Sequence, residues 1–241
     1  MKIALLGYGK MGKAIEAFCN EHTSHQITKK VNSSNAEEFN TSFLNNVDIA
    51  IDFSQPELAK KYITGCVSAG VPVVSGTTGW HSDWDEVKQY VVQNNGALLY
   101  SSNFSIGVHL FWKVSEFAAT LFNEHNDYLV HIEETHHIHK KDAPSGTAIT
   151  TAETVMAHMT KYSGWTMDET NQDKLIPIEA KRIGEVPGTH CLTFANTIDE
   201  FSIQHKAYSR NGFVQGAVKA AEFLIDKQGV FGMEDLLTKK E

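Results

Sequence analysis

Residues 2–12 read Lys2-Ile3-Ala4-Leu5-Leu6-Gly7-Tyr8-Gly9-Lys10-Met11-Gly12. The apolar run before Gly7 predicts a buried parallel strand, and the residues from about Lys10 onward predict a helix. The glycines between them follow the G-x-G-x-x-G spacing. In that spacing the first glycine makes a tight turn, the second lets the backbone approach a pyrophosphate, and the third lets helix and strand pack closely. The stretch therefore predicts a dinucleotide-binding site.

The alternation of strand and helix continues through the first hundred residues. Further strands are predicted at residues 26–31, 47–53, 71–75 and 97–100, with helical segments between them. This order is typical of an α/β fold with a Rossmann-like, doubly wound parallel sheet. We expect this sheet to form a dinucleotide-binding domain over residues 1–104.

The pattern changes after Asn103. One long helix is predicted by four apolar residues at spacings of three and four, Leu110, Val114, Phe117 and Leu121. Residues 178–207 then predict several strands joined by turns, so we expect residues 105–215 to form a smaller α+β domain with an open mixed sheet. Residues 162–175 predict a surface loop, and residues 216–241 predict a C-terminal helix that completes the first domain.

The composition excludes several classes of partner. A net charge of -8 and a pI near 5.8 argue against nucleic acid, because proteins that bind it usually carry a positive face. Cys19, Cys66 and Cys191 are widely separated and offer neither a disulfide framework nor a C-x-x-C pair. The N-terminal apolar run is too short for a signal peptide, and no later run could span a bilayer. The sequence therefore predicts a cytoplasmic protein that acts on small molecules and binds no membrane.

The end of the second predicted strand bears on the choice of dinucleotide. The fingerprint expects an Asp or Glu about twenty residues after the glycines, where it holds the ribose 2′-hydroxyl of NAD. Here the strand ends in Lys29-Lys30-Val31-Asn32-Ser33-Ser34, and the nearest carboxylates are those of Glu37 and Glu38. Without the acid a 2′-phosphate meets no repulsion, and Lys10 can meet it as a point charge. NADPH is therefore weakly preferred as the cofactor, with NADH as the alternative.

Two more polar segments follow predicted strands and are expected at the same sheet edge, where open parallel sheets collect ligands. They are Gly76-Thr77-Thr78-Gly79 and Ser101-Ser102-Asn103-Phe104-Ser105. Both predict contacts with the nicotinamide end of the cofactor. The residues expected to bind the cofactor are Gly7, Tyr8, Gly9, Lys10, Met11, Gly12, Gly76, Thr77, Thr78, Ser101, Ser102, Asn103 and Phe104.

The densest chemistry lies in Glu133-Glu134-Thr135-His136-His137-Ile138-His139-Lys140-Lys141-Asp142-Ala143-Pro144-Ser145-Gly146-Thr147-Ala148. Its histidines and lysines gather proton donors and positive charge, which suits an anionic substrate that must also be protonated. A helix is predicted from Thr147 to about Met159 with Ser145 as its cap. The amides of Ser145, Gly146 and Thr147 would then point outward from its positive end. This predicts a carboxylate site, to which Lys140 adds a full positive charge.

The run His136-His137-x-His139-Lys140-x-Asp142-Ala143-Pro144-Ser145-Gly146-Thr147-Ala148 resembles the signature of the dihydrodipicolinate reductase family. The resemblance also covers the glycine turn, Asp52-Phe53-Ser54, Gly76 to Gly79, Asn103 to Val108, Lys206 to Arg210 and Gly216-Ala217. It extends over nearly the whole chain and adds Phe53 to the expected cofactor-binding residues. The polar loop from Asn32 to Asn46 departs from the family pattern.

The resemblance implies a reductase of lysine and diaminopimelate biosynthesis. In this reading hydride passes from NAD(P)H to a cyclic dicarboxylate, 4-hydroxy-tetrahydrodipicolinate, and the product is tetrahydrodipicolinate. The subunits would form a homotetramer, with cofactor in the first domain and substrate in the second. His136 and Lys140 would donate protons, His137 would contact one substrate carboxylate, and Gly146 with Thr147 would bind the other. Ser145, at the same helix start, completes the expected substrate-binding set.

Three other interpretations are open from the residues. A zinc-dependent hydrolase would use His136, His137 and His139 with Glu133 or Glu134. However, adjacent histidines in a strand point to opposite sides and no H-E-x-x-H helix is present, so we expect no metal. A different amino-acid dehydrogenase acting on a dicarboxylate would share the cofactor half. A noncatalytic NAD(P)-sensing or interaction module would bind without turnover. Separately from these functions, the bland interpretation is that His136 and His137 are ordinary surface residues of a loop.

Overall fold

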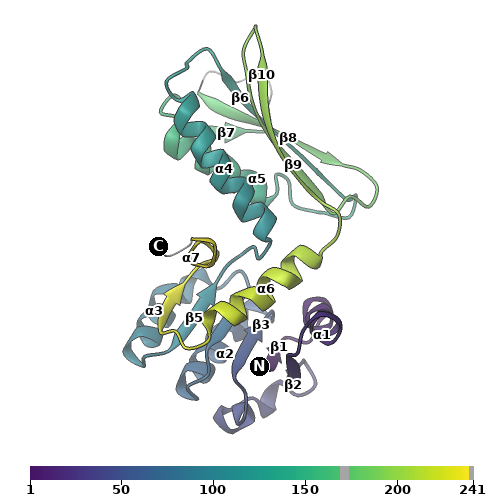
Figure 1. Ribbon diagram of the computed structural model, residues 1–241, viewed down its shortest axis with the longest axis vertical. Coiled ribbons are helices and arrows are strands. Elements are labelled where there is room, and N and C mark those ends of the chain that lie inside the picture. Colours follow the sequence, from purple (N-terminus) through teal and green to yellow (C-terminus); the bar gives the residue numbers. More distant parts are fainter. Residues whose placement is uncertain (169–173, 239–241) are drawn as a thin grey trace. The chain divides into compact units, whose positions relative to one another are not determined.

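The computed structural model describes residues 1–168 and 174–238. The chain forms two compact units, the first made of Met1–Ile106 with Asn211–Glu241 and the second of Gly107–Arg210 (Figure 1). The first contains a parallel sheet and the second a mixed sheet. The predicted α/β class, with a Rossmann-like sheet and a second mixed sheet, is therefore confirmed.

The first unit is built on a six-stranded sheet whose strands all run parallel. Its strands are β1 (Lys2–Leu6), β2 (Gln26–Val31), β3 (Ile49–Asp52), β4 (Val73–Ser75), β5 (Ala97–Tyr100) and β11 (Gly229–Phe231). They are ordered β11-β5-β4-β3-β1-β2, so the direction of winding reverses beside β1. Such a reversal opens a crevice at the carboxyl ends of the strands, where open α/β sheets bind ligands.

Helices cover both faces of this sheet. They are α1 (Lys10–His22), α2 (Pro56–Ser68), α3 (Trp84–Gln93) and α6 (Asn211–Leu224), with the short α7 (Met233–Leu237) near the chain end. Alternate strand residues face opposite layers: Ile3 and Leu5 pack with α1 and α6, whereas Ala4 and Leu6 pack with α2 and α3. Two apolar layers thus enclose the sheet, as expected for buried parallel strands.

The C-terminal segment differs from the single helix expected over residues 216–241. Helix α6 begins earlier, at Asn211, and ends at Leu224; β11 then adds to the sheet beside β5, and α7 follows. Residues 239–241 lie outside the described part. After α6 the chain turns at Asp226, whose φ is 61°. Strand β11 was not predicted because three residues are too few to show a periodicity. A Cβ on Gly216 would lie 1.7 Å from the carbonyl oxygen of Phe104, so glycine allows α6 to pack this closely.

The second unit has a five-stranded sheet ordered β10-β9-β6-β8-β7. Its strands are β6 (Leu129–His136), β7 (Gly164–Thr166), β8 (Leu175–Arg182), β9 (Gly188–Ala195) and β10 (Glu200–Ala207). Strand β6 pairs with β8 in parallel and with β9 antiparallel. Helices α4 (Ile106–Phe122) and α5 (Gly146–His158) pack through apolar side chains on one face of this sheet (Figure 1).

Helix α4 was predicted correctly, but its marker residues do not form its buried face. Leu110, Val114, Phe117 and Leu121 are all at least half exposed. Phe111 and other residues on the opposite side of the helix pack against the sheet instead. An exposed apolar stripe of this size on a helix is unusual for a surface that faces only water.

Part of the segment predicted as a surface loop, residues 162–175, is structured. Tyr162 is buried, and Gly164–Thr166 forms β7 at the edge of the sheet, while residues 169–173 lie outside the described part. Among the helices of the described chain, none has the length and apolar character that crossing a membrane requires.

His190 provides a test of how the second unit is packed. His190 is 4% exposed, and its pKa is lowered to about 3, mainly by burial. The charges of His136, His205 and Lys140 also lower this pKa, whereas the charge of Glu134 raises it. The unfolded chain takes up a proton as the pH falls through about 6.5, whereas the folded chain does not until much lower pH. The free energy of unfolding should therefore decrease as the pH falls from about 6.5 towards 3.

We expect His190→Gln to flatten this pH dependence, because glutamine does not titrate. Chemical denaturation at several pH values between 7 and 5 measures it, and one such group contributes a slope of up to about 1.4 kcal/mol per pH unit. His22→Gln, at an exposed site on α1, is the control. An identical slope in His190→Gln and the parent would mean that His190 is not held neutral in the fold.

Candidate active site

The glycine turn closes against the end of β3. Gly7 has a φ of +93°, and a Cβ there would lie 2.2 Å from the carbonyl oxygen of Phe53. A Cβ on Gly12 would lie 2.7 Å from the carbonyl oxygen of Gly7, whereas a Cβ on Gly9 would meet no described atom within 4 Å. Gly7 and Gly12 thus serve chain packing, while Gly9 leaves open space in front of α1. The first turn of α1 is Lys10–Lys13, which suits an anion at the helix N-terminus.

Two adjoining cavities lie along this edge of the first unit and share Gly9, Phe53 and Ser54. The larger has a volume of about 330 Å³ and the smaller about 280 Å³. Predicted cofactor-binding residues that line the larger are Gly7, Tyr8, Gly9 and Phe53. Those that line the smaller are Gly9, Lys10, Met11, Phe53, Gly76, Thr77 and Thr78. The glycine turn and the Gly76 segment are therefore brought together, as their positions after strands predict.

A buried carboxylate organises the same edge. Asp52, at the end of β3, is fully buried and accepts hydrogen bonds from the Ser54 amide (3.1 Å), the Ser75 hydroxyl (2.8 Å) and the Thr77 hydroxyl (2.9 Å). Burial raises the pKa of Asp52, and these hydrogen bonds oppose that rise. Asp52 thereby links the turn after β3 to the segment after β4, and it was not among the residues predicted to bind the cofactor.

The residues of the predicted segment after β5 are not among those that line these two cavities. The Ser101 hydroxyl donates to the Asn103 carbonyl at 2.6 Å, and Ser102 is exposed. Phe104 is 2% exposed and packs edge-on against Phe53 with ring centroids 5.5 Å apart. The side chain of Phe104 therefore supports Phe53 from the core.

The basic residue at the end of β2 is already paired. Nζ of Lys30 lies 2.5 Å from Oε1 of Glu16 and 4.7 Å from the centre of the Tyr8 ring, and the Tyr8 hydroxyl donates to Glu16. The hydrogen bond from Lys30 and that from Tyr8 lower the pKa of Glu16. The turn that follows is held by Asn32, whose Oδ1 accepts from the amide and the hydroxyl of Ser34.

In the second unit, the register of the sheet gathers a polar cluster at the end of β6. Glu134 lies opposite His190 of β9, and His136 lies beside Arg182 of β8. Glu134 is fully buried; its Oε1 accepts from Arg182 (3.0 Å) and from the Ser145 amide (3.1 Å), and its Oε2 lies 2.7 Å from Nδ1 of His136. Burial alone would raise the pKa of Glu134, but these three contacts lower it to about 2.

The start of α5 is attached to this cluster through Ser145. Its hydroxyl oxygen accepts from the Ala148 amide (3.2 Å) as the helix cap and lies 3.1 Å from Nε2 of His190. Ser145 was expected to bind substrate, but it is 2% exposed and both its amide and its hydroxyl are engaged within the protein. Ser145 is thus the cap of α5, and the exposed part of the helix start begins at Gly146 with half-buried Thr147 after it.

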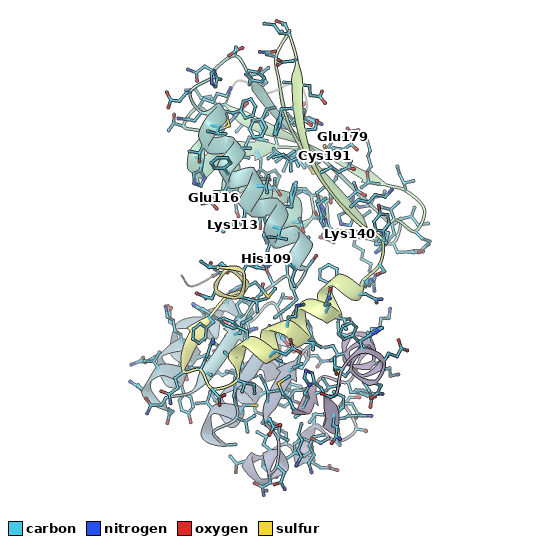
Figure 2. All side chains as sticks on the ribbon, in the orientation of Figure 1. His109, Lys113, Glu116, Lys140, Glu179 and Cys191 are labelled. Atoms are coloured by element: carbon cyan, nitrogen blue, oxygen red, sulfur yellow. The ribbon has the colours of Figure 1, made fainter. Side chains whose placement is uncertain are left out.

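The loop between β6 and α5 carries the other charged residues (Figure 2). Nζ of Lys140 donates to both carboxylate oxygens of Asp142, at 2.9 and 2.8 Å, and this interaction lowers the pKa of Asp142. His137 is half-buried, whereas His139 is exposed and lies 3.5 Å from Glu185. Of the three clustered histidines, His136 alone is buried beside a carboxylate.

The structure also bears on the zinc interpretation. Within the described residues, the one set of potential metal ligands that comes together is Glu134, His136 and His190, whose ligand atoms lie within 4.8 Å of one another. The predicted alternative set with His137 and His139 is not assembled. A metal cation at Glu134 would be repelled by the positive charge of Arg182, which donates a hydrogen bond to the same carboxylate.

Arg182 and His190 were not predicted as site residues, because they are about fifty residues from His136 along the chain. One signal was present: β9 alternates between buried and half-buried residues, and His190 occupies a buried position where an apolar residue is expected. The assembled cluster can hold an imidazole in a fixed orientation next to a helix N-terminus. That combination suits transfer of a proton to an anionic substrate.

Comparisons with known proteins agree over the whole chain. The family model described as dihydrodipicolinate reductase, N-terminus, matches residues 1–104, and the one described as dihydrodipicolinate reductase, C-terminus, matches residues 107–237. A 4-hydroxy-tetrahydrodipicolinate reductase of Christiangramia forsetii is 45% identical over 240 residues, which cover 99% of this chain and 98% of that protein. One of Methanoculleus marisnigri is 33% identical over 253 residues, covering 98% and 99%.

A solved structure extends the similarity to the fold. A dipicolinate-bound dihydrodipicolinate reductase from Paenisporosarcina sp. TG-14 aligns with a TM-score of 0.80 at 22% identity, covering 98% of both chains. Both halves of the sequence match models of one family, and a relative aligned over nearly the full length of both chains is 45% identical. The chain therefore belongs to the dihydrodipicolinate reductase family.

Proposed function

We propose that this protein reduces 4-hydroxy-tetrahydrodipicolinate to tetrahydrodipicolinate with hydride from NAD(P)H, in the biosynthesis of diaminopimelate and lysine. The reaction consumes one hydride and one proton and releases one water. The relatives named above carry this activity in their names. The observation that carries the proposal is the fixed neighbourhood of His136 and the start of α5, which joins a proton donor to an anion site.

The substrate end of the proposal rests on the N-terminus of α5. Gly146 and Thr147 lie at the positive end of a thirteen-residue helix, where backbone amides attract a carboxylate. A Cβ on Gly146 would meet no described atom within 4 Å, so this position leaves room for a ligand. We assign one substrate carboxylate to Gly146 and Thr147 and the other to His137.

His136 and Lys140 are the proposed proton donors. Reduction leaves electron-rich ring atoms that need a proton from a positioned acid. His136 is held by Glu134, and Lys140 lies on the loop that joins His136 to α5, where Asp142 engages its ammonium group. Glu134 also accepts from the Ser145 amide, which links His136 to the start of α5, and Lys140 lies on the loop between them. We assign the proton to one of these two groups.

The cofactor is assigned to the paired cavities of the first unit. When bound, it supplies the hydride. The open space at Gly9, the required glycines at positions 7 and 12 and the N-terminus of α1 fit a dinucleotide pyrophosphate. Of the described residues that line the larger cavity, none is acidic, and Asn32 and Ser33 occupy the position of the fingerprint acid. We therefore keep NADPH as the preferred cofactor, with NADH also used.

We further propose that the subunits form a cytoplasmic homotetramer. The exposed stripe of Leu110, Val114, Phe117 and Leu121 on α4 supports association, because such a surface gains from being covered. The stripe is flanked by the ion pair of Lys113 and Glu116, separated by 2.9 Å on the same helix (Figure 2).

Loss of either proton donor should lower turnover. We expect His136→Gln or Lys140→Ala to reduce kcat by roughly a hundredfold or more, the scale of general-acid catalysis. The assay follows NADPH oxidation with the condensation product of pyruvate and aspartate semialdehyde. His139→Gln and Lys141→Ala, which change the same residue types in the same loop, are the controls. Full activity in both His136→Gln and Lys140→Ala would remove their assigned roles.

A second change tests the cofactor assignment. Asn32→Asp preserves the oxygen that accepts from Ser34 and adds a negative charge to the larger cavity. A 2′-phosphate there would be repelled, so NADPH should bind about tenfold more weakly or worse while NADH binding changes little. Fluorescence titration measures both dissociation constants. Asn40→Asp adds the same charge outside the cavity and should change neither; equal losses for both cofactors in Asn32→Asp would contradict the placement.

A further inference from the structure

Glu134 connects three segments of the second unit through one buried side chain. It projects from β6, two residues before His136. It accepts from Arg182 at the end of β8 and from the Ser145 amide at the start of α5. Arg182 in turn donates to the Asp142 carbonyl at 2.6 Å and to the Lys181 carbonyl at 2.8 Å, which ties β8 to the loop before α5. The carboxylate thus has a fixed position before any ligand binds.

The two ring nitrogens of His136 have different surroundings. Nδ1 lies 2.7 Å from Oε2 of Glu134, while Nε2 is on the side of Gly188, where a Cβ would approach it to 3.1 Å. An ionised carboxylate accepts and cannot donate, so its approach to 2.7 Å favours a proton on Nδ1 over a lone pair there. Glycine at position 188 keeps a side chain away from Nε2. The nitrogen that exchanges a proton is therefore Nε2.

The partners of Glu134 explain how its carboxylate stays ionised although it is buried. An isolated buried carboxylate would take up a proton, and a protonated Glu134 could no longer require a proton on Nδ1. The guanidinium of Arg182 and the amide of Ser145 occupy Oε1, which leaves Oε2 for His136. His190, 3.8 Å from Oε2, stays neutral at ordinary pH because burial lowers its pKa to about 3. Its ring adds no competing charge.

We propose that Glu134 is the positioning residue of the active site: it holds His136 as the Nδ1–H tautomer with Nε2 as the proton-transferring atom. The same carboxylate holds the Ser145 amide, so it also sets the place of His136 relative to the anion site at Gly146. The catalytic part of this inference rests on the proposed function of His136. In the transfer step the ring is first protonated on both nitrogens. The N–H bond at Nε2 then breaks as its proton bonds to the electron-rich atom of the substrate that hydride addition leaves, and the proton on Nδ1 stays, so that the ring returns to the neutral Nδ1–H tautomer.

The tautomer is directly measurable. Nitrogen-15 NMR of labelled histidines, with the His136 signal assigned by comparison with His136→Gln, distinguishes Nδ1–H from Nε2–H rings. We expect Nδ1–H in the parent protein and a shift towards Nε2–H in Glu134→Gln, where the amide can donate to Nδ1. An Nε2–H ring in the parent would overturn the proposal, even where Glu134→Gln does not fold.

Kinetics test the consequence. Glu134→Gln should lower kcat by about tenfold or more, with KM changed far less, because the ring is misaligned but the anion site remains. Glu133→Gln is the matched control: Glu133 is next to Glu134 on the opposite face of β6 and pairs with Lys181 at 2.6 Å, just as Glu134 pairs with Arg182. It should keep parental kcat. A loss confined to KM or to thermal stability in Glu134→Gln would indicate a purely structural role and overturn the proposal.

The double variant separates this inference from the proposed function. If Glu134 acts through His136, adding Glu134→Gln to His136→Gln should cost less than about threefold in kcat, because the group it positions is already gone. A full multiplicative loss would show that Glu134 acts independently and would contradict the proposal. Full activity of His136→Gln alone would instead remove the proposed role of His136, while the NMR result would still decide how its ring is held.

Discussion

The second unit depends on the ionised carboxylate of Glu134. A buried charge is costly unless it is compensated. Here Oε1 accepts from Arg182 and from the Ser145 amide, and Oε2 lies 2.7 Å from Nδ1 of His136. These partners come from a neighbouring strand, a helix start and the same strand. Through this interaction, the register of the sheet fixes the imidazole of His136, the proposed proton donor, close to the N-terminus of α5.

The first unit uses a buried carboxylate in a comparable way. Asp52 gathers the Ser54 amide with the hydroxyls of Ser75 and Thr77, and so joins two turns at the carboxyl edge of the sheet. Each unit also presents a helix N-terminus, α1 after Gly9 and α5 after Ser145, next to its organising acid. The proposed function needs two anion sites, and each unit presents one helix N-terminus, a feature that attracts anions.

Much of this arrangement could be predicted from the sequence, for local reasons. The turn at Gly7 and the cap at Ser145 are short-range patterns, and they correctly placed the starts of α1 and α5. Arg182 and His190 reach His136 only through strand pairing, which spacing along the chain does not reveal. The apolar stripe on α4 predicted the helix but not its buried face, because the stripe is exposed. Apolar residues at this periodicity occur both on buried helix faces and on helix faces that associate with another chain. Strand β11 was too short for any periodicity to appear.

A crystal structure with pyridine-2,6-dicarboxylate, a planar mimic of the substrate ring, tests the central claim most directly. Our account predicts one carboxylate of the mimic within hydrogen-bonding distance of the amides of Gly146 and Thr147. It also predicts that the ring faces Nε2 of His136, while Nδ1 remains against Glu134. A mimic bound elsewhere on the second unit, or a His136 ring turned so that Nε2 meets Glu134, would contradict it.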